Sequence, residues 1–165
     1  MSLVIWWSLT GVFLIVLQLL GSPLSPNKPV DITFPRTAES TIELVDAYGA
    51  EGQREYNWYE AVDLIFIVVY GTTLYLSFQT LATNAYARCT LQALVFITCA
   101  ADYFEDGDAL LLNNVMPFLS EDVVAEISVV AVSLKNAGLF VCFTAVIILA
   151  IASRCNKNGY DALRS

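Results

Sequence analysis

"LIFIVVYGTTLYLSFQTLATNAYA", residues 64–87, is a run of 24 positions without a charged side chain. A helix needs about 18 or more mainly apolar residues to cross the hydrocarbon core of a bilayer, since it rises only about 1.5 Å per residue. The run is long enough to contain a membrane span. This run therefore indicates a membrane protein, and the rest of the chain is interpreted with that fold class in mind.

Two further uncharged runs lie near the ends of the chain: residues 3–20 and 136–153 each hold no charge across 18 positions. Of the 165 residues, 57% are hydrophobic and 15% are charged, whereas soluble domains carry about 25% charged residues. No Lys or Arg precedes the first run. It therefore lacks the positive region of a cleaved signal peptide, and we expect it to be retained. Together these features predict an integral protein that crosses the membrane several times.

A fourth span is expected between the second run and the last. Residues 81–100 hold one charge, Arg88, and a turn near Thr83 and Asn84 would divide a helix that is otherwise too long for one bilayer. The predicted fold class is all-α, a four-helix transmembrane bundle that forms a single domain over residues 1–165. The expected spans are 3–21, 58–81, 85–106 and 122–153, with a first loop over 22–57 and a cytoplasmic tail over 154–165.

Within the first loop, "STIELVDAYG" (40–49) predicts a short amphipathic helix. Ser40 can cap its first turn, with Glu43 three residues further on, which is the spacing of a capping box. Gly49 or Gly52 can end the helix. Aromatic residues at the start of the second span suit the bilayer interface: Tyr56, Trp58 and Tyr59.

Four spans would place both termini on one side of the membrane. That side would carry four basic residues against one acid, Asp161, a net charge of +3. The other side would carry fifteen of the sixteen acids and four basic residues, a net charge of −11. Basic residues flank spans on the cytoplasmic side, so we expect cytoplasmic termini and acidic loops on the outer or lumenal side. An acidic face also repels nucleic acid, which is not expected as a partner.

Four ionisable side chains from three expected spans fall at one height. Measured from the cytoplasmic ends at about 1.5 Å per residue, Asp63 and Lys135 lie about 27 Å up, Asp102 about 24 Å and Glu105 about 28 Å. Ionisable groups inside spans usually face the bundle interior and pair with one another. We therefore predict a polar intramembrane cluster of Asp63, Asp102, Glu105 and Lys135.

The surroundings and charge of this cluster lead to two interpretations. Tyr70 and Asn136 are expected as polar neighbours, whereas Asp106 and Asp108 are expected beyond the hydrocarbon core, in the headgroup region or in water. Three acids and one base leave surplus negative charge, so either a carboxylate keeps a proton or a cation binds. A structural ion pair that fixes helix register is the favoured interpretation, and a functional site is the alternative.

The sequence contains no histidine, which excludes Ser-His-Asp and Cys-His catalysis as well as His-ligated zinc or haem. Its four cysteines form no CxxC motif, and none lies in the acidic loops, so no disulfide framework is expected. The stretch "DYFEDGDALLLN" (102–113) fails as an EF-hand, because Phe104 and Asn113 occupy its third and twelfth positions; a looser divalent site in this stretch stays open. We assign no catalytic residue, no metal and no cofactor.

Four short motifs resemble a family of small bacterial-type four-span membrane proteins without an assigned activity. They are "GAEGQREY" (49–56), Asp63, "DYFED" (102–106) and "SLK" (133–135). The family pattern has Asn where this chain has Asp106. The resemblance covers about residues 45–140; it is consistent with the polar cluster and implies no function.

Three classes of function fit these features. The first is a non-enzymatic accessory or structural subunit of a membrane complex, which contacts the lipid bilayer and other membrane proteins or a second copy of itself. The span at 3–21 suits such contacts, because it is uncharged and Gln18 is its one strongly polar side chain. The second is a small proton- or cation-coupled transporter or channel that uses the Asp/Glu–Lys cluster. The third is an interfacial lipid-modifying enzyme.

Overall fold

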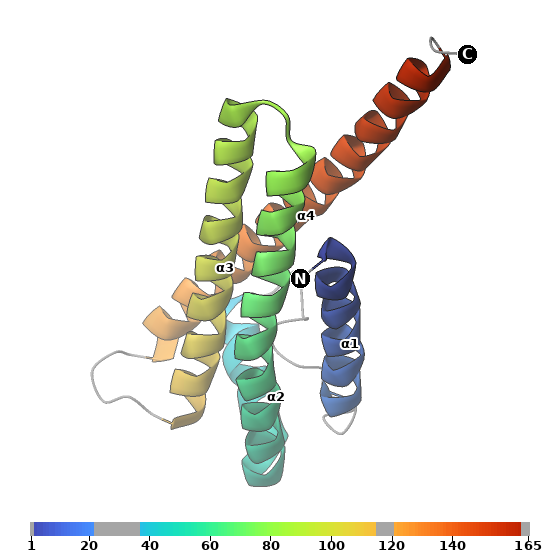
Figure 1. The fold of residues 1–165 in the computed structure, drawn as a ribbon. Helices are drawn as coiled ribbons and strands as arrows, with labels where there is room; N and C mark the ends of the chain where they lie inside the picture. Colours follow the sequence, from blue (N-terminus) through green and yellow to red (C-terminus); the bar gives the residue numbers. More distant parts are fainter. Residues whose placement is uncertain (1, 22–36, 115–120, 163–165) are drawn as a thin grey trace.

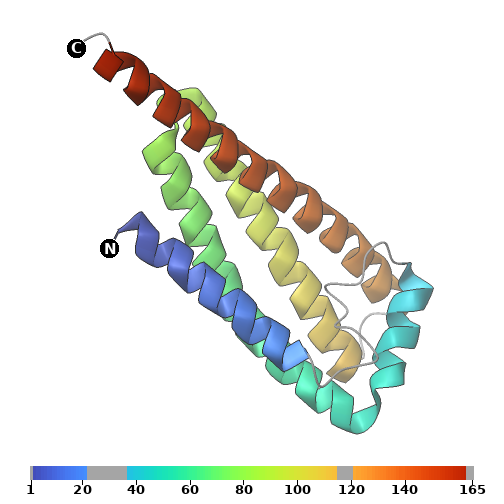
Figure 2. The ribbon, with the colours of Figure 1, turned by 90° about the vertical axis from the view of Figure 1, so that its right-hand side faces the viewer.

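The computed structural model describes residues 2–21, 37–114 and 121–162, and within these ranges the chain is all-α. The helices are α1 (Leu3–Gly21), α2 (Ala38–Leu81), α3 (Ala85–Asn114) and α4 (Glu121–Ala162). In Figures 1 and 2 they run up and down in turn, and α2, α3 and α4 lie together with α1 beside α2. The prolines of the first loop and the stretch 115–120 lie outside the described residues.

A connection of only three residues joins α2 to α3, at the turn that the sequence predicts. The N–H of Ala82 donates to the carbonyl of Phe78 and closes α2, while the side-chain oxygen of Asn84 accepts the N–H of Ala87 at 3.0 Å and caps α3. A short link between helices makes them antiparallel neighbours. Residues of α3 therefore face residues of α2 over the whole length of the pair (Figure 1).

The start of α2 differs from the prediction. Its cap is Thr37, whose hydroxyl accepts the N–H of Ser40 while the Ser40 hydroxyl accepts the N–H of Thr37, so the capping box lies three residues earlier than expected. Gly49 does interrupt the helix, with a φ of 62°, a conformation that glycine adopts without steric cost. The first helical segment therefore bends away from the rest of α2 (Figure 2). Beyond the bend, residues 50–57 are helical and not part of a loop.

Both later helices extend further than predicted. The structure continues α3 to Asn114 and α4 to Ala162, whereas the expected ends were residues 106 and 153. In α3 the extra turns pass through Gly107; a glycine inside a helix costs only about 1 kcal/mol relative to alanine. In α4 the expected tail is helical over residues 154–162.

Three of the helices are long and apolar enough to cross a membrane: α1, residues Glu51–Leu81 of α2 and residues Glu126–Cys155 of α4. Their composition is that of a membrane protein. Among the described residues, α3 does not join this group, because the uncharged run between Arg88 and Asp102 is only 13 residues long. Four spans were expected from the sequence, whereas three helices in the described residues meet this requirement.

One face of α1 packs against α2. Thr10 and Leu17 are its buried residues, and the hydroxyl of Thr10 lies 2.9 Å from the hydroxyl of Thr73 in a buried hydrogen bond between the two helices. Phe13 stacks on Phe66 with ring centroids 6.2 Å apart. Most of the remaining surface of α1 consists of exposed apolar side chains: Val4, Ile5, Val12, Leu14, Ile15, Val16 and Leu19.

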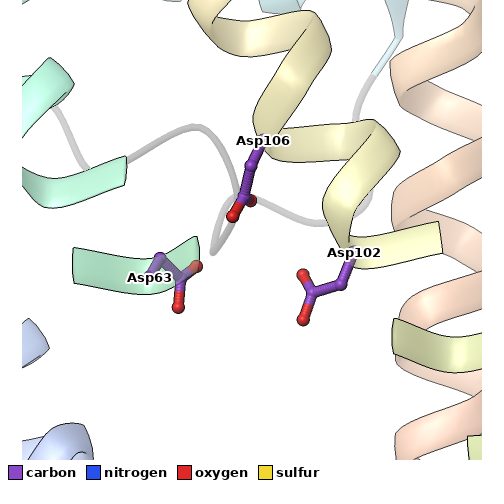
Figure 3. Close-up of side chains that lie close together, drawn as sticks. All are labelled: Asp63, Asp102 and Asp106. Carbon is purple, nitrogen blue, oxygen red and sulfur yellow. The ribbon is translucent and has the colours of Figure 1, made fainter. Parts of the chain in front are cut away.

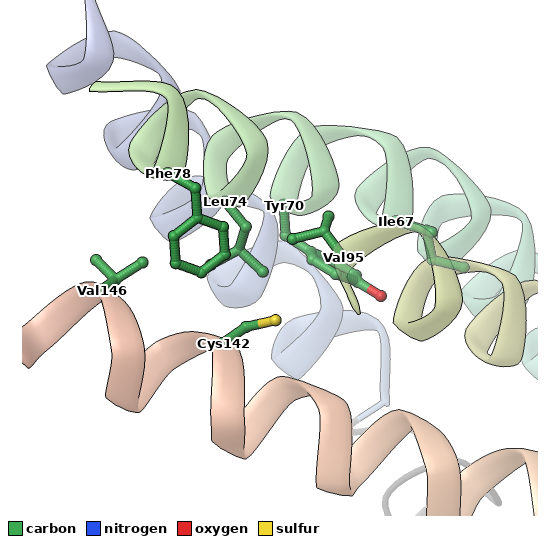
Figure 4. Close-up of a cluster of buried hydrophobic side chains, with 7 residues drawn as sticks. All are labelled: Ile67, Tyr70, Leu74, Phe78, Val95, Cys142 and Val146. Carbon is green, nitrogen blue, oxygen red and sulfur yellow. The ribbon is translucent and has the colours of Figure 1, made fainter. Parts of the chain in front are cut away.

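An apolar cluster fills the space between α2, α3 and α4 toward the end where α2 meets α3 (Figure 4). Its buried members are Ile67, Tyr70, Leu74, Phe78, Val95, Cys142 and Val146. Glycines allow the helices to approach closely. A Cβ at Gly71 would lie 2.7 Å from the Cys99 sulfur, and one at Gly138 would overlap the Thr98 side chain. Small residues at such crossings let helix backbones pack together.

Candidate functional site: a buried carboxylate and lysine cluster

One face of α3 carries three buried acids. Asp102, Glu105 and Asp106 are 2%, 1% and 0% exposed. Residues three and four apart lie on the same face of a helix, so all three side chains enter the bundle from one side. Asp106 was expected beyond the hydrocarbon core, in the headgroup region or in water. Its burial contradicts exposure to water, because its spacing of four from Asp102 turns it inward. The side chain of Asp108 lies outside the described part of the structure.

Lys135 of α4 binds two of these carboxylates. Its Nζ lies 2.6 Å from Asp102 Oδ1 and 2.9 Å from Glu105 Oε2, and the residue is only 8% exposed. Charge-assisted contacts of this length are strong, and a lysine that reaches two carboxylates links α4 to two successive turns of α3. The structure thus brings Asp102, Glu105 and Lys135 together.

Tyr70 ties α2 to the same group. Its hydroxyl donates a hydrogen bond of 2.5 Å to Asp102 Oδ2, so both oxygens of that carboxylate have a partner. The ring of Tyr70 belongs to the apolar cluster, which makes this residue the boundary between the apolar and charged parts of the interior. Asn136 is half-buried.

Asp63 of α2 faces the acids of α3. It is buried, and one oxygen from each of Asp63, Asp102 and Asp106 lies within 4.8 Å of the others. Figure 3 shows the three carboxylates pointing into one shared space, Asp63 from α2 and the other two from α3. Carboxylates this close cannot all ionise in a dry interior unless positive charge lies beside them. All four of the residues expected in the cluster are buried here, from three helices.

Glu60 also belongs to this group, although it was not among the residues predicted from the sequence. It is fully buried, and its carboxylate lies within electrostatic range of Asp106. The spacing of three residues between Glu60 and Asp63 placed both on one helix face. That signal was available, but Glu60 lies close to the expected start of the span at residue 58 and was not included in the predicted cluster. The helix in fact runs unbroken from residue 50.

The group defined by Glu60, Asp63, Asp102, Glu105, Asp106 and Lys135 is called the carboxylate cluster below. Five acids and one base give it a formal charge of −4 when all are ionised. Charged groups withdrawn from water are costly unless they are paired or bind a cation. The chemistry that this arrangement can perform is therefore the binding of protons or metal ions by carboxylate oxygens.

Next to the carboxylate cluster lies a group of aromatic residues that were expected at the bilayer interface. Tyr56 and Tyr59 are buried and stack at a centroid distance of 6.1 Å, with Tyr48 against Tyr56 at 5.2 Å. Leu17 of α1 belongs to the same cluster. Trp58 alone among the three expected anchors is exposed, at 69%. The first segment of α2 thus packs back on the helices through Tyr48.

Compared with protein-family models, curated proteins and solved structures, the chain has no match. No family is therefore assigned, and the resemblance of the four short motifs carries no argument about function. The chemistry of the site has to be argued from its own residues.

Proposed function

We propose that this chain is a four-span integral membrane protein that acts as a non-enzymatic accessory or structural subunit of a membrane complex. The three-residue link between α2 and α3 supports the fourth span. If residues 51–81 cross the bilayer, α3 starts on the far side and has to return alongside α2. Lys135 against Asp102 and Glu105 lowers the cost of carrying the acids of α3 into the membrane.

In the proposed topology both termini face the cytoplasm, as the basic residues near Arg88 and Arg154 favour. Two exposed cysteines, Cys89 and Cys155, would then lie on that side. In single-cysteine variants, a membrane-impermeant maleimide should label either residue only after permeabilisation. Glu51→Cys, at an exposed position near the other end of α2, should react in intact cells. Labelling of Cys89 and Cys155 from opposite sides would contradict four spans.

The observation that carries the subunit role is how little of α1 the chain itself buries. Only Thr10 and Leu17 are buried, and α1 packs mainly against α2. Helices in lipid associate through close packing and hydrogen bonds between them. The uncharged outer face of α1 is therefore free for lipid, another membrane protein or a second copy of this chain.

Site-specific photo-crosslinking tests this role. A photoreactive residue at Val12 or Leu19, both on the exposed face of α1, should yield a discrete protein adduct in native membranes. The matched control is Ile148 on the exposed apolar face of α4, where adducts with lipid are expected. Lipid adducts alone at every position would contradict a subunit role that uses α1.

A second candidate function is a proton- or cation-coupled transporter, which the burial of five acids from α2 and α3 beside Lys135 favours. In the described residues, the apolar cluster around Phe78 separates this site from the α2–α3 turn. Transport would thus require the helices to rearrange. In proteoliposomes, a pH gradient should dissipate faster with the wild-type chain than with Asp102→Asn. Equal rates for both and for empty vesicles would exclude this candidate.

A further inference from the structure

Asp106 is the member of the carboxylate cluster that lacks a partner. It is fully buried, and within the described residues no donor forms a hydrogen bond with either of its oxygens. Its carboxylate points into the space that Asp63 and Asp102 also face (Figure 3). Leaving a buried polar group unsatisfied costs free energy, and the cost is larger for a charge. This orientation is therefore expected where a bound cation supplies the missing contact.

The donor set defines the class of cation. Asp63, Asp102 and Asp106 offer only carboxylate oxygens, which are the ligands of hard divalent ions such as Ca²⁺, Mg²⁺ and Mn²⁺. The described cluster offers no imidazole, and the donor set itself contains no sulfur. Soft or borderline metals that prefer sulfur and nitrogen are thus disfavoured.

The arrangement of the oxygens suits an ion with flexible coordination. One oxygen from each of Asp63, Asp102 and Asp106 lies within 4.8 Å of the others, and the three side chains come from two helices. Ca²⁺ takes about six to eight oxygen ligands in flexible geometry, whereas Mg²⁺ requires near-ideal octahedral coordination. We therefore expect this set of carboxylates to bind Ca²⁺ better than Mg²⁺.

The contacts of Lys135 and Tyr70 with Asp102 do not prevent the three aspartates from binding a cation. Lys135 Nζ contacts Asp102 Oδ1 and Glu105 Oε2, and the Tyr70 hydroxyl donates to Asp102 Oδ2. Each carboxylate oxygen can accept more than one contact, so Asp102 can bridge the lysine and an ion. The two groups also hold Asp102 in place, as outer contacts do for metal ligands.

We propose that Asp63, Asp102 and Asp106 form a binding site for one divalent cation, with Ca²⁺ preferred over Mg²⁺. The site joins α2 to α3 at the charged end of the bundle. It goes beyond the subunit role and does not depend on it, since the three carboxylates converge whatever the chain assembles with.

The test uses the full chain in nanodiscs, stripped with a chelator and titrated with CaCl₂, MgCl₂ or NaCl. A ligand that binds only the folded state raises the thermal midpoint as its concentration rises above Kd. The wild-type midpoint should therefore rise with Ca²⁺, less with Mg²⁺, and not with NaCl at equal ionic strength. Equilibrium dialysis with radioactive Ca²⁺ should give one ion per chain.

Asp106→Asn is the decisive variant, because it removes one ligand charge without changing the shape of the side chain. It should weaken Ca²⁺ binding by more than about tenfold, since even the loss of an outer-shell partner typically costs that much. Asp46→Asn makes the same chemical change at an exposed position of α2 and should bind as the wild type does. If Asp106→Asn does not fold, Asp63→Asn on the neighbouring helix replaces it.

The order of stability of the wild type and Asp106→Asn is expected to reverse between chelator and saturating Ca²⁺. In chelator, Asp106→Asn should be more stable than the wild type, since it relieves repulsion among the acids; in saturating Ca²⁺ it should be less stable. A wild-type midpoint that ignores Ca²⁺, an equal response to NaCl, or an unchanged Ca²⁺ response in both Asp106→Asn and Asp63→Asn would overturn the proposal. None of these outcomes would contradict the subunit role, which the crosslinking of α1 tests separately.

Discussion

The two ends of the interior between α2, α3 and α4 are both buried but are held together in different ways. Around Phe78, Val95 and Cys142 the helices meet mainly through apolar contacts. Around Asp102, about two turns away along these helices, they meet through ion pairs and hydrogen bonds. Tyr70 belongs to both, with its ring in one part and its hydroxyl in the other. In a bilayer, lipid can replace an apolar neighbour but not a lysine. We therefore expect the charged end to be the more sensitive to substitution.

The largest effect is expected from Lys135→Met. The change leaves Asp102 and Glu105 buried without their shared cation, and removing one partner of a buried pair typically costs about 3 kcal/mol or more. The free energy of unfolding, measured by denaturation in mixed micelles, should fall by that amount. Lys135→Met combined with Glu105→Gln should recover part of the loss. An unchanged free energy of unfolding in the single variant would show that the ion pairs do not hold the bundle together.

A smaller effect is expected at the apolar end, from Phe78→Ala. In water-soluble proteins the loss of a buried Phe side chain costs about 3–5 kcal/mol. In a bilayer the separated helices also contact hydrocarbon, so only the lost packing remains, and we expect about 2 kcal/mol. The control is Phe96→Ala, at an exposed position of α3, which should change stability little. A loss at Phe78 larger than that at Lys135 would reverse the comparison.

Gly138 lies between the two ends, one turn from Lys135 and one from Cys142, and is expected to show the smallest effect. A Cβ there would overlap the Thr98 side chain, so Gly138→Ala should cost about 1.5 kcal/mol by pushing α4 from α3. Adding Thr98→Ala should restore part of that loss. If the double variant is no more stable than the single one, Thr98 is not what limits the approach of these helices. The same unfolding assay applies.

Charge-free runs and helical geometry account for the parts of the molecule that were predictable from its sequence. An uncharged stretch over residues 3–20 predicted a helix that the structure places at Leu3–Gly21. The count of 1.5 Å per residue placed Asp63, Asp102 and Lys135 at a similar height, and in the structure these residues lie together in the interior. The membrane depth itself stays a prediction.

What the sequence did not predict depends on where helices begin and end. With the second span starting at residue 58, Glu60 was not included in the cluster, and with the third ending at residue 106, Asp106 was expected in the headgroup region or in water. Both are fully buried, because α2 and α3 continue past those limits and their spacing of three or four residues turns the acids inward. Gly52 was a possible helix end, but α2 continues through it to Leu81.

The short α2–α3 turn has a consequence for how the chain enters a membrane. With its acids, α3 is too polar to partition alone, so in the proposed topology it has to be carried in by α2 as one hairpin. Lys135 is synthesised only afterwards, with α4. A nascent chain that has not yet reached α4 therefore holds these carboxylates without their counter-ion. The α2–α3 hairpin is then fully stabilised only when α4 packs against it.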